Sequence, residues 1–133
     1  MALQFGTTYR NALLDQFETT VGTTMKIRIF TGSAPANCAA ADSGTKLVET
    51  AAPSDYMAAA AAGSKVGSGL PWTSAGLAAG TTGYFRCYDS AFATCHMQGT
   101  CGTSGTDMII DNAVVAVGQN VNITAFTLTA PGA

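Results

Sequence analysis

The chain contains few charged residues: Asp, Glu, Lys and Arg make up 11% of its 133 residues, against about a quarter in an average globular protein. The six Lys and Arg residues are scattered, and the nearest two, Lys26 and Arg28, stand two positions apart. A nucleic-acid surface needs clustered cations to displace counterions from phosphates, and anionic membranes also attract basic clusters. The sequence therefore predicts a protein that binds neither nucleic acid nor a membrane.

The chain also lacks a long hydrophobic run. Residues 1–20 include Asp15 and Glu18 and show no continuous apolar stretch of the kind that a secretory signal contains. No segment approaches the ~20 apolar residues of a membrane-spanning helix. We expect a soluble protein made in the cytoplasm. Because no repeat, linker or change in composition interrupts the sequence, we predict a single domain over residues 1–133.

Histidine and cysteine are too sparse for the common catalytic and metal sites. Cys95 and the single histidine, His96, are adjacent, and neighbours on a strand point to opposite faces, which argues against a shared metal or a Cys/His dyad. The acids Asp107 and Asp111 are typical of turn caps. We therefore predict no catalytic residues, no metal and no cofactor. The remaining cysteines are Cys38, Cys87 and Cys101.

Two of these cysteines are predicted to be small apolar core residues. Cys87 and Cys101 stand among apolar neighbours, with Phe85 expected on the same strand face as Cys87. The sequence places them on neighbouring strands. A cytoplasmic product usually keeps its thiols reduced, so a bond between them is expected only after cell lysis.

One amphipathic segment near the N-terminus predicts a helix. Thr7 or Thr8 is placed to cap it, it runs through Phe17, and Gly22 marks its end. Apolar residues recur at helical spacing, while polar residues fall on another face; the apolar residues are Tyr9, Leu13, Leu14 and Phe17, and the polar ones Asn11 and Asp15. A short helix is marginal alone, so we expect residues 1–17 to pack on a neighbouring subunit or another partner surface as well as on their own domain.

The sequence after the helix has the pattern of an all-β protein. Short apolar or alternating runs are separated by turn residues and predict strands at 25–30, 46–50, 80–89, 95–101, 108–110, 113–117 and 121–129. Residues 56–69 favour a loose strand or loop, with a short helix as the alternative. About eight short strands at this spacing predict a β-sandwich or jelly roll, preceded by an N-terminal helical segment at 1–22.

The strand at 80–89 carries the predicted interface anchor. Alternation places Tyr84, Arg86 and Tyr88 on one face. Arginine is enriched at protein interfaces, so Arg86 is predicted to anchor a partner. A structural or interface ion pair with Asp89 or Asp107 is favoured over a substrate clamp. Together with the N-terminal segment, the predicted protein interface comprises Leu3, Phe5, Tyr9, Leu13, Phe17, Tyr84, Arg86 and Tyr88.

Five segments resemble a group of small virion proteins of tailed bacteriophages: LQFGTTYRNALLDQF, MKIRIFTGSAPA, AGTTGYFRCYDS, MQGTCGTSGTDMII and VAVGQNVNITAFTLTAPGA. The resemblance covers nearly the whole chain and is most specific at Tyr84-Phe85-Arg86 and Gln98-Gly99-Thr100. Cys87 and Cys101 depart from it, because bulkier apolar residues are expected there. The resemblance implies a capsid-associated β-sandwich of the decoration or cement type.

Two functions follow as expectations. The first is a virion structural protein, not an enzyme, that binds the major capsid protein, reinforces the shell and forms dimers or trimers. A surface rich in Thr, Ser and Ala with little charge suits a protein docked on a large assembly. The alternative is a receptor- or carbohydrate-binding module of a tail or tail fibre. That module would use exposed aromatic rings for stacking, namely Tyr84, Tyr88, Trp72 and Phe92.

Overall fold

A computed structural model describes residues 2–133; Met1, the first residue of the predicted 1–22 segment, lies outside the described residues. The helix α1 (Thr7–Val21) precedes ten strands in this part of the chain. The strands are β1 (Lys26–Phe30), β2 (Lys46–Ala51), β3 (Ser64–Val66), β4 (Trp72–Ala75), β5 (Gly80–Thr81), β6 (Tyr84–Tyr88), β7 (Cys95–Gly102), β8 (Met108–Ile110), β9 (Val114–Val115) and β10 (Asn120–Thr129). The prediction of a mostly β chain with an N-terminal helix is confirmed.

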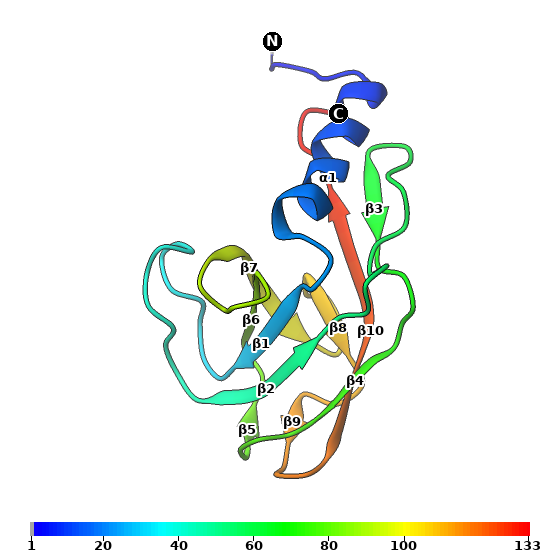
Figure 1. The fold of residues 1–133 in the computed structure, drawn as a ribbon. Helices are drawn as coiled ribbons and strands as arrows, with labels where there is room; N and C mark the ends of the chain where they lie inside the picture. The colour runs from blue at the N-terminus through cyan, green and yellow to red at the C-terminus, as the bar shows by residue number, and fades with distance from the viewer. Residues whose placement is uncertain (1) are drawn as a thin grey trace.

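Eight of the strands form one curled sheet, a half-barrel, with the helix at one end of it (Figure 1). Its order is β2-β1-β6-β7-β8-β10-β3, β4 also pairs with β10, and β5 and β9 form a separate two-stranded pair. The pairing of β7 with β8 is parallel and the other pairings are antiparallel, so the sheet is mixed. The predicted β-sandwich or jelly roll is not confirmed by this pairing.

Alternation along the central strands places the core inside the curl. In β1, Ile27 and Ile29 are buried while Arg28, between them, points outward. In the neighbouring strand β6, Phe85 and Cys87 belong to the core cluster, and the alternate residues on the other face are buried as well. Period-2 burial of apolar side chains thus fixes the register of β1 against β6.

The last strand departs from the predicted clean alternation. Val121 and Ile123 of β10 are buried as expected, but the pairing with β8 shifts register between Ile123 and Ala125. A bulge adds one residue to the strand and reverses the phase of the side chains after it. Phe126 therefore turns into the core, where its ring packs edge-to-face on that of Phe85 at 5.6 Å between centroids.

The helix begins and ends close to the predicted positions. Gly6, rather than Thr7 or Thr8, occupies the N-cap position, and no side chain caps the helix. The helix continues past Phe17 to Val21 and stops at Gly22, which adopts a positive φ of 91° and donates its N–H to Glu18 O. Residues 56–69 contain β3 and turns, so the helical alternative for this described segment is wrong.

The predicted strand at 80–89 is divided into β5 and β6 by Thr82 and Gly83. A Cβ atom on Gly83 would lie 1.8 Å from Gly32 O, so this close approach of two backbones requires glycine. Gly32 belongs to residues 31–45, the long connection between β1 and β2 that we call the 31–45 loop (cyan in Figure 1). The crossing brings that loop next to β6.

Candidate functional site

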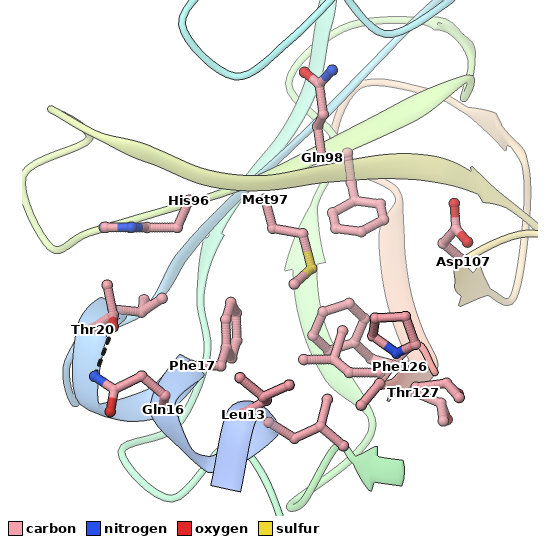
Figure 2. A pocket seen from close by; sticks show the side chains of 17 residues that line it. Leu13, Gln16, Phe17, Thr20, His96, Met97, Gln98, Asp107, Phe126 and Thr127 are labelled. Carbon is pink, nitrogen blue, oxygen red and sulfur yellow. Dashed lines mark hydrogen bonds between the residues drawn. The ribbon is translucent and has the colours of Figure 1, made fainter. Parts of the chain in front are cut away.

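An apolar groove of about 580 Å³ lies between α1 and the curled sheet. Figure 2 shows Leu13 and Phe17 of α1 on one side of it, with Met97 of β7 and Phe126 of β10 opposite. Leu128 of β10 adds to the same lining. The predicted interface did not include Phe126 and Leu128. The sequence did place both on one face of the last strand, and that alternation was the signal that could have identified them as one wall of a groove.

The groove exists because the helix is attached by its other side. Arg10 is buried and its Nη2 donates to Ala130 O at 2.8 Å, next to the end of β10. Asn11 Oδ1 accepts a hydrogen bond from the backbone N–H of Gly63 at 2.8 Å. Polar contacts to the backbone thus hold α1 against the sheet end and the β3 turn.

A buried lysine completes this attachment. Lys65 of β3 is 1% exposed, and its Nζ lies 2.6 Å from Asp15 Oδ1 and 2.7 Å from Glu18 Oε2. Burial lowers the pKa of Lys65, but the hydrogen bonds and charges of Asp15 and Glu18 outweigh it, so the net pKa is raised. The hydrogen bond from Lys65 in turn lowers the pKa of Asp15. The pair is therefore fully ionised at neutral pH.

The apolar side of the helix is only partly covered: Leu14 and Val21 are buried. Tyr9 is 54% exposed and Leu13 is 42% exposed, although both carry large apolar surfaces. Phe17 is half-buried, with its ring edge-to-face on that of Tyr56 at 6.4 Å. An amphipathic helix normally buries its apolar stripe. Here part of that stripe faces the groove, and this arrangement suits binding of apolar side chains from another molecule.

The polar residues at the groove do not form a catalytic set. Figure 2 shows His96 and Asp107 at opposite ends of the groove. Asp107 Oδ2 accepts hydrogen bonds from the N–H and hydroxyl of Thr100, each at 2.9 Å, which is the turn-capping role predicted for it. Within residues 2–133, no group of three or more His, Cys, Asp or Glu side chains is placed to hold a metal ion.

The N-terminal part of the predicted interface lies at the helix end of the molecule. Leu3 is 77% exposed. Phe5 is half-buried: its backbone N–H donates to Gly132 O at 2.7 Å and its ring packs edge-to-face on that of Tyr9. These contacts fasten the segment before α1 to the C-terminal tail of its own chain. The structure thus brings Leu3, Phe5, Tyr9, Leu13 and Phe17 together along the helix and its lead-in.

The strand residues of the predicted interface require a correction. Tyr84, Arg86 and Tyr88 do share a face of β6, but all three are buried, and Arg86 is 2% exposed. The 31–45 loop covers this face: Tyr84 Oη donates to Ser43 O at 2.6 Å, and Tyr88 Oη donates to Asp42. The predicted alternation is confirmed, but no sequence pattern indicated that a loop would cover this face.

Arg86 is the centre of the covered cluster. Its guanidinium donates to the carbonyls of Asn37 and Ala40 at 3.0 and 2.8 Å and to the side-chain oxygen of Gln98 at 2.9 Å. Its ion pair is with Asp42, at 2.9 Å, so the predicted pairing with Asp89 or Asp107 is wrong. With its donors used inside the chain, Arg86 is a structural residue and not an anchor for a partner.

The aromatic residues that were predicted to stack on a ligand are buried or contact other side chains of this protein. Trp72, Tyr84 and Tyr88 are buried, and Trp72 Nε1 donates to Ser68 O at 2.9 Å. Phe92 is half-buried, and the guanidinium carbon of Arg28 lies 4.0 Å from the centre of its ring. These four rings therefore offer no open stacking face for a sugar.

The two predicted core cysteines are buried, and β6 and β7 are paired as expected. Cys101 N donates to Gly83 O, whereas Cys87 pairs with Met97. The two cysteines are thus four residues apart along β6 (87 minus 83), or ~13 Å at the rise of a strand. Since a disulfide needs Cα atoms within about 7 Å, this geometry excludes a bond between them.

No helix within residues 2–133 has the length and apolar character needed to cross a membrane. A scan against protein-family models, a search of curated proteins and a search of solved structures each found no match to this chain. The open groove and the helix beside it are the features of the structure that suit binding of a partner.

Proposed function

We propose that this protein is a non-enzymatic structural protein of a tailed-bacteriophage virion that binds the outside of the capsid and reinforces the shell. Its partner is the major capsid protein. The observation that carries the proposal is a helix held by polar contacts at Arg10, Asn11 and Lys65 while its apolar side, with Leu13, borders an open groove. Such a groove is preformed and needs little reordering when a partner enters.

The groove favours a protein partner. Its lining joins aromatic and aliphatic side chains to a few polar groups such as Gln16 and Thr20, which hydrogen bond to one another at 3.2 Å. Covering a side chain such as Leu13 with apolar atoms contributes roughly 25 cal/mol for each Å² of apolar surface removed from water. One such contact is modest. On a shell with many identical sites, self-association into dimers or trimers links several contacts and strengthens attachment.

The β-sandwich implied by the phage resemblance belongs to this proposal as well. Two hydrogen bonds that join opposite sides of the half-barrel support a sandwich. Ser74 Oγ of β4 donates to Glu49 O of β2 at 3.2 Å, and Leu77 N donates to Leu47 O at 2.8 Å. We propose that the half-barrel is a distorted sandwich in which these contacts join the two layers.

Copy number in purified particles tests the proposal. Quantitative mass spectrometry should find hundreds of copies per virion, in proportion to the capsid subunits, and heads stripped of the protein should release their genome at a lower temperature than decorated heads. A handful of copies located at the tail would instead support the tail-module alternative. Equal release temperatures for stripped and decorated heads would contradict a reinforcing role.

A further inference from the structure

Two cysteines outside the core are in contact with each other. Cys38 lies in the 31–45 loop and Cys95 is the first residue of β7, and their sulfur atoms are 2.8 Å apart. Both side chains are half-buried free thiols. Cys95 pairs with Tyr88 across the sheet, on the face that the loop covers, so the contact joins the loop directly to the strand beneath it.

We propose that Cys38 and Cys95 form a reversible disulfide when the chain meets a small-molecule disulfide such as oxidised glutathione, and that this bond locks the 31–45 loop onto the sheet. The bond stands on the geometry of this chain and is independent of the capsid-binding proposal. In contrast with Cys87 and Cys101, whose register holds them apart, this pair needs only a small movement of a loop.

The reaction balances as two thiol–disulfide exchanges. The Cys38 thiolate attacks one sulfur of oxidised glutathione, forming a mixed disulfide and releasing one glutathione thiolate. Cys95 then loses its proton to solvent and attacks Cys38 Sγ, which expels the second glutathione thiolate. Two protein thiols lose two electrons and two protons, and one glutathione disulfide becomes two thiols. Burial and the neighbouring Cys38 raise the pKa of Cys95 to about 12. Exchange in the opposite order, beginning at Cys95, gives the same bond and the same balance.

The bond would act on the buried polar cluster. The loop already supplies Asp42 and the carbonyls of Asn37 and Ala40 to Arg86, and Pro35 O accepts from Gln98 Nε2 at 2.7 Å. A disulfide from Cys38 to Cys95 closes a separation of 57 residues, which restricts the unfolded chain. Oxidation should therefore raise the melting temperature by about 10 °C and slow amide exchange in the loop.

The test treats the purified full chain with oxidised glutathione at mildly alkaline pH, followed by non-reducing peptide mapping. The expected product has lost two hydrogens, links the Cys38 and Cys95 peptides, keeps Cys87 and Cys101 free, and reverts with dithiothreitol. Mapping the native chain requires no variant to fold. A stable glutathione adduct on Cys38, a bond to Cys87 or Cys101, or a linked dimer would overturn the proposal.

Cysteine variants test whether the Cys38–Cys95 disulfide itself causes the rise in melting temperature. Cys38→Ser and Cys95→Ser should each lose the oxidant-dependent rise in melting temperature, while the matched control Cys101→Ser, in the core, should retain it. If the Cys38–Cys95 bond forms without any rise in melting temperature and without slower exchange in residues 31–45, the locking role is refuted.

Discussion

Two segments cover the central strands of the half-barrel, and they do so in opposite ways. The 31–45 loop covers the outer face of β6, whose five residues are all buried, and the polar side chains that it buries are satisfied by hydrogen bonds, with Arg86 at the centre. The helix α1 covers the inner face at one end of the sheet. It is fixed by its polar side, and an apolar groove remains open beside it.

The two faces differ in the kind of role that their side chains can have: one stabilises the fold, and the other is available to a partner. A buried arginine with every donor directed at its own chain contributes to the shape of the fold, and it is costly to disturb. An apolar helix side left open costs stability in the free protein and is repaid when a partner covers it. Residue type alone would suggest the reverse, because Arg and Tyr are common at interfaces.

The largest effect is expected for Arg86→Ala. Removing the guanidinium takes away the buried partner of Asp42, whose other ion pair is with Arg28 at 3.3 Å. It also leaves Ala40 O without its donor and Asn37 O with only the backbone N–H of Ala40. Loss of one member of a buried ion pair costs about 3–5 kcal/mol, to be measured as the free energy of unfolding in urea. Lys46→Ala is the matched control, because Lys46 forms a partly exposed ion pair with Glu49, worth about 0–1 kcal/mol. Equal costs for the two variants would refute the structural role assigned to Arg86.

A smaller effect is expected for Lys65→Met. The substitution keeps an apolar stem under the helix but leaves Asp15 and Glu18, both partly exposed, without their cation. We expect a cost of about 1–2 kcal/mol, at the lower range for a charged hydrogen-bond network that solvent partly reaches. Amide exchange in α1 should accelerate while exchange in β6 and β7 stays unchanged. Uniform acceleration across the sheet would show that the helix is not a separately attached cover.

The same ion pairs predict a pH profile for the helix. The pKa of Asp15 is lowered from 3.8, so its contribution is complete above about that value and is lost as the pH falls through its folded pKa. The pKa of Lys65 is raised from 10.5, so its contribution is complete below about that value and is lost as the pH rises through its folded pKa. Circular dichroism and exchange should show a plateau between these limits. In Lys65→Met, the alkaline loss should become smaller, and the remainder belongs to buried groups such as Tyr56, whose pKa burial raises to about 12.

The sequence predicted individual strands and the helix better than it predicted which segments lie on the two faces of the sheet. Period-2 alternation identified β1 and β6 and the shared face of Tyr84, Arg86 and Tyr88, and Gly22 marked the helix end, because these features depend on neighbouring residues. Which segment lies on that face depends on long-range contacts. The 31–45 loop has no periodicity, and Lys65 stands 50 residues from Asp15, so neither contact leaves a pattern in the sequence. The bulge in β10 likewise follows from pairing with β8.

The most direct test of the account is co-sedimentation of Leu13→Asp with purified heads. Leu13 is 42% exposed at the groove, so its substitution should lower the free energy of unfolding by about 1 kcal/mol and leave the protein folded. A carboxylate buried against an apolar partner should weaken binding at least about tenfold. The control, Val117→Asp, changes an apolar side chain that is 72% exposed next to β9, at the end of the half-barrel away from α1 (Figure 1). The account predicts unchanged binding for the control. Full binding by a folded Leu13→Asp protein, or an equal loss in both variants, would contradict it.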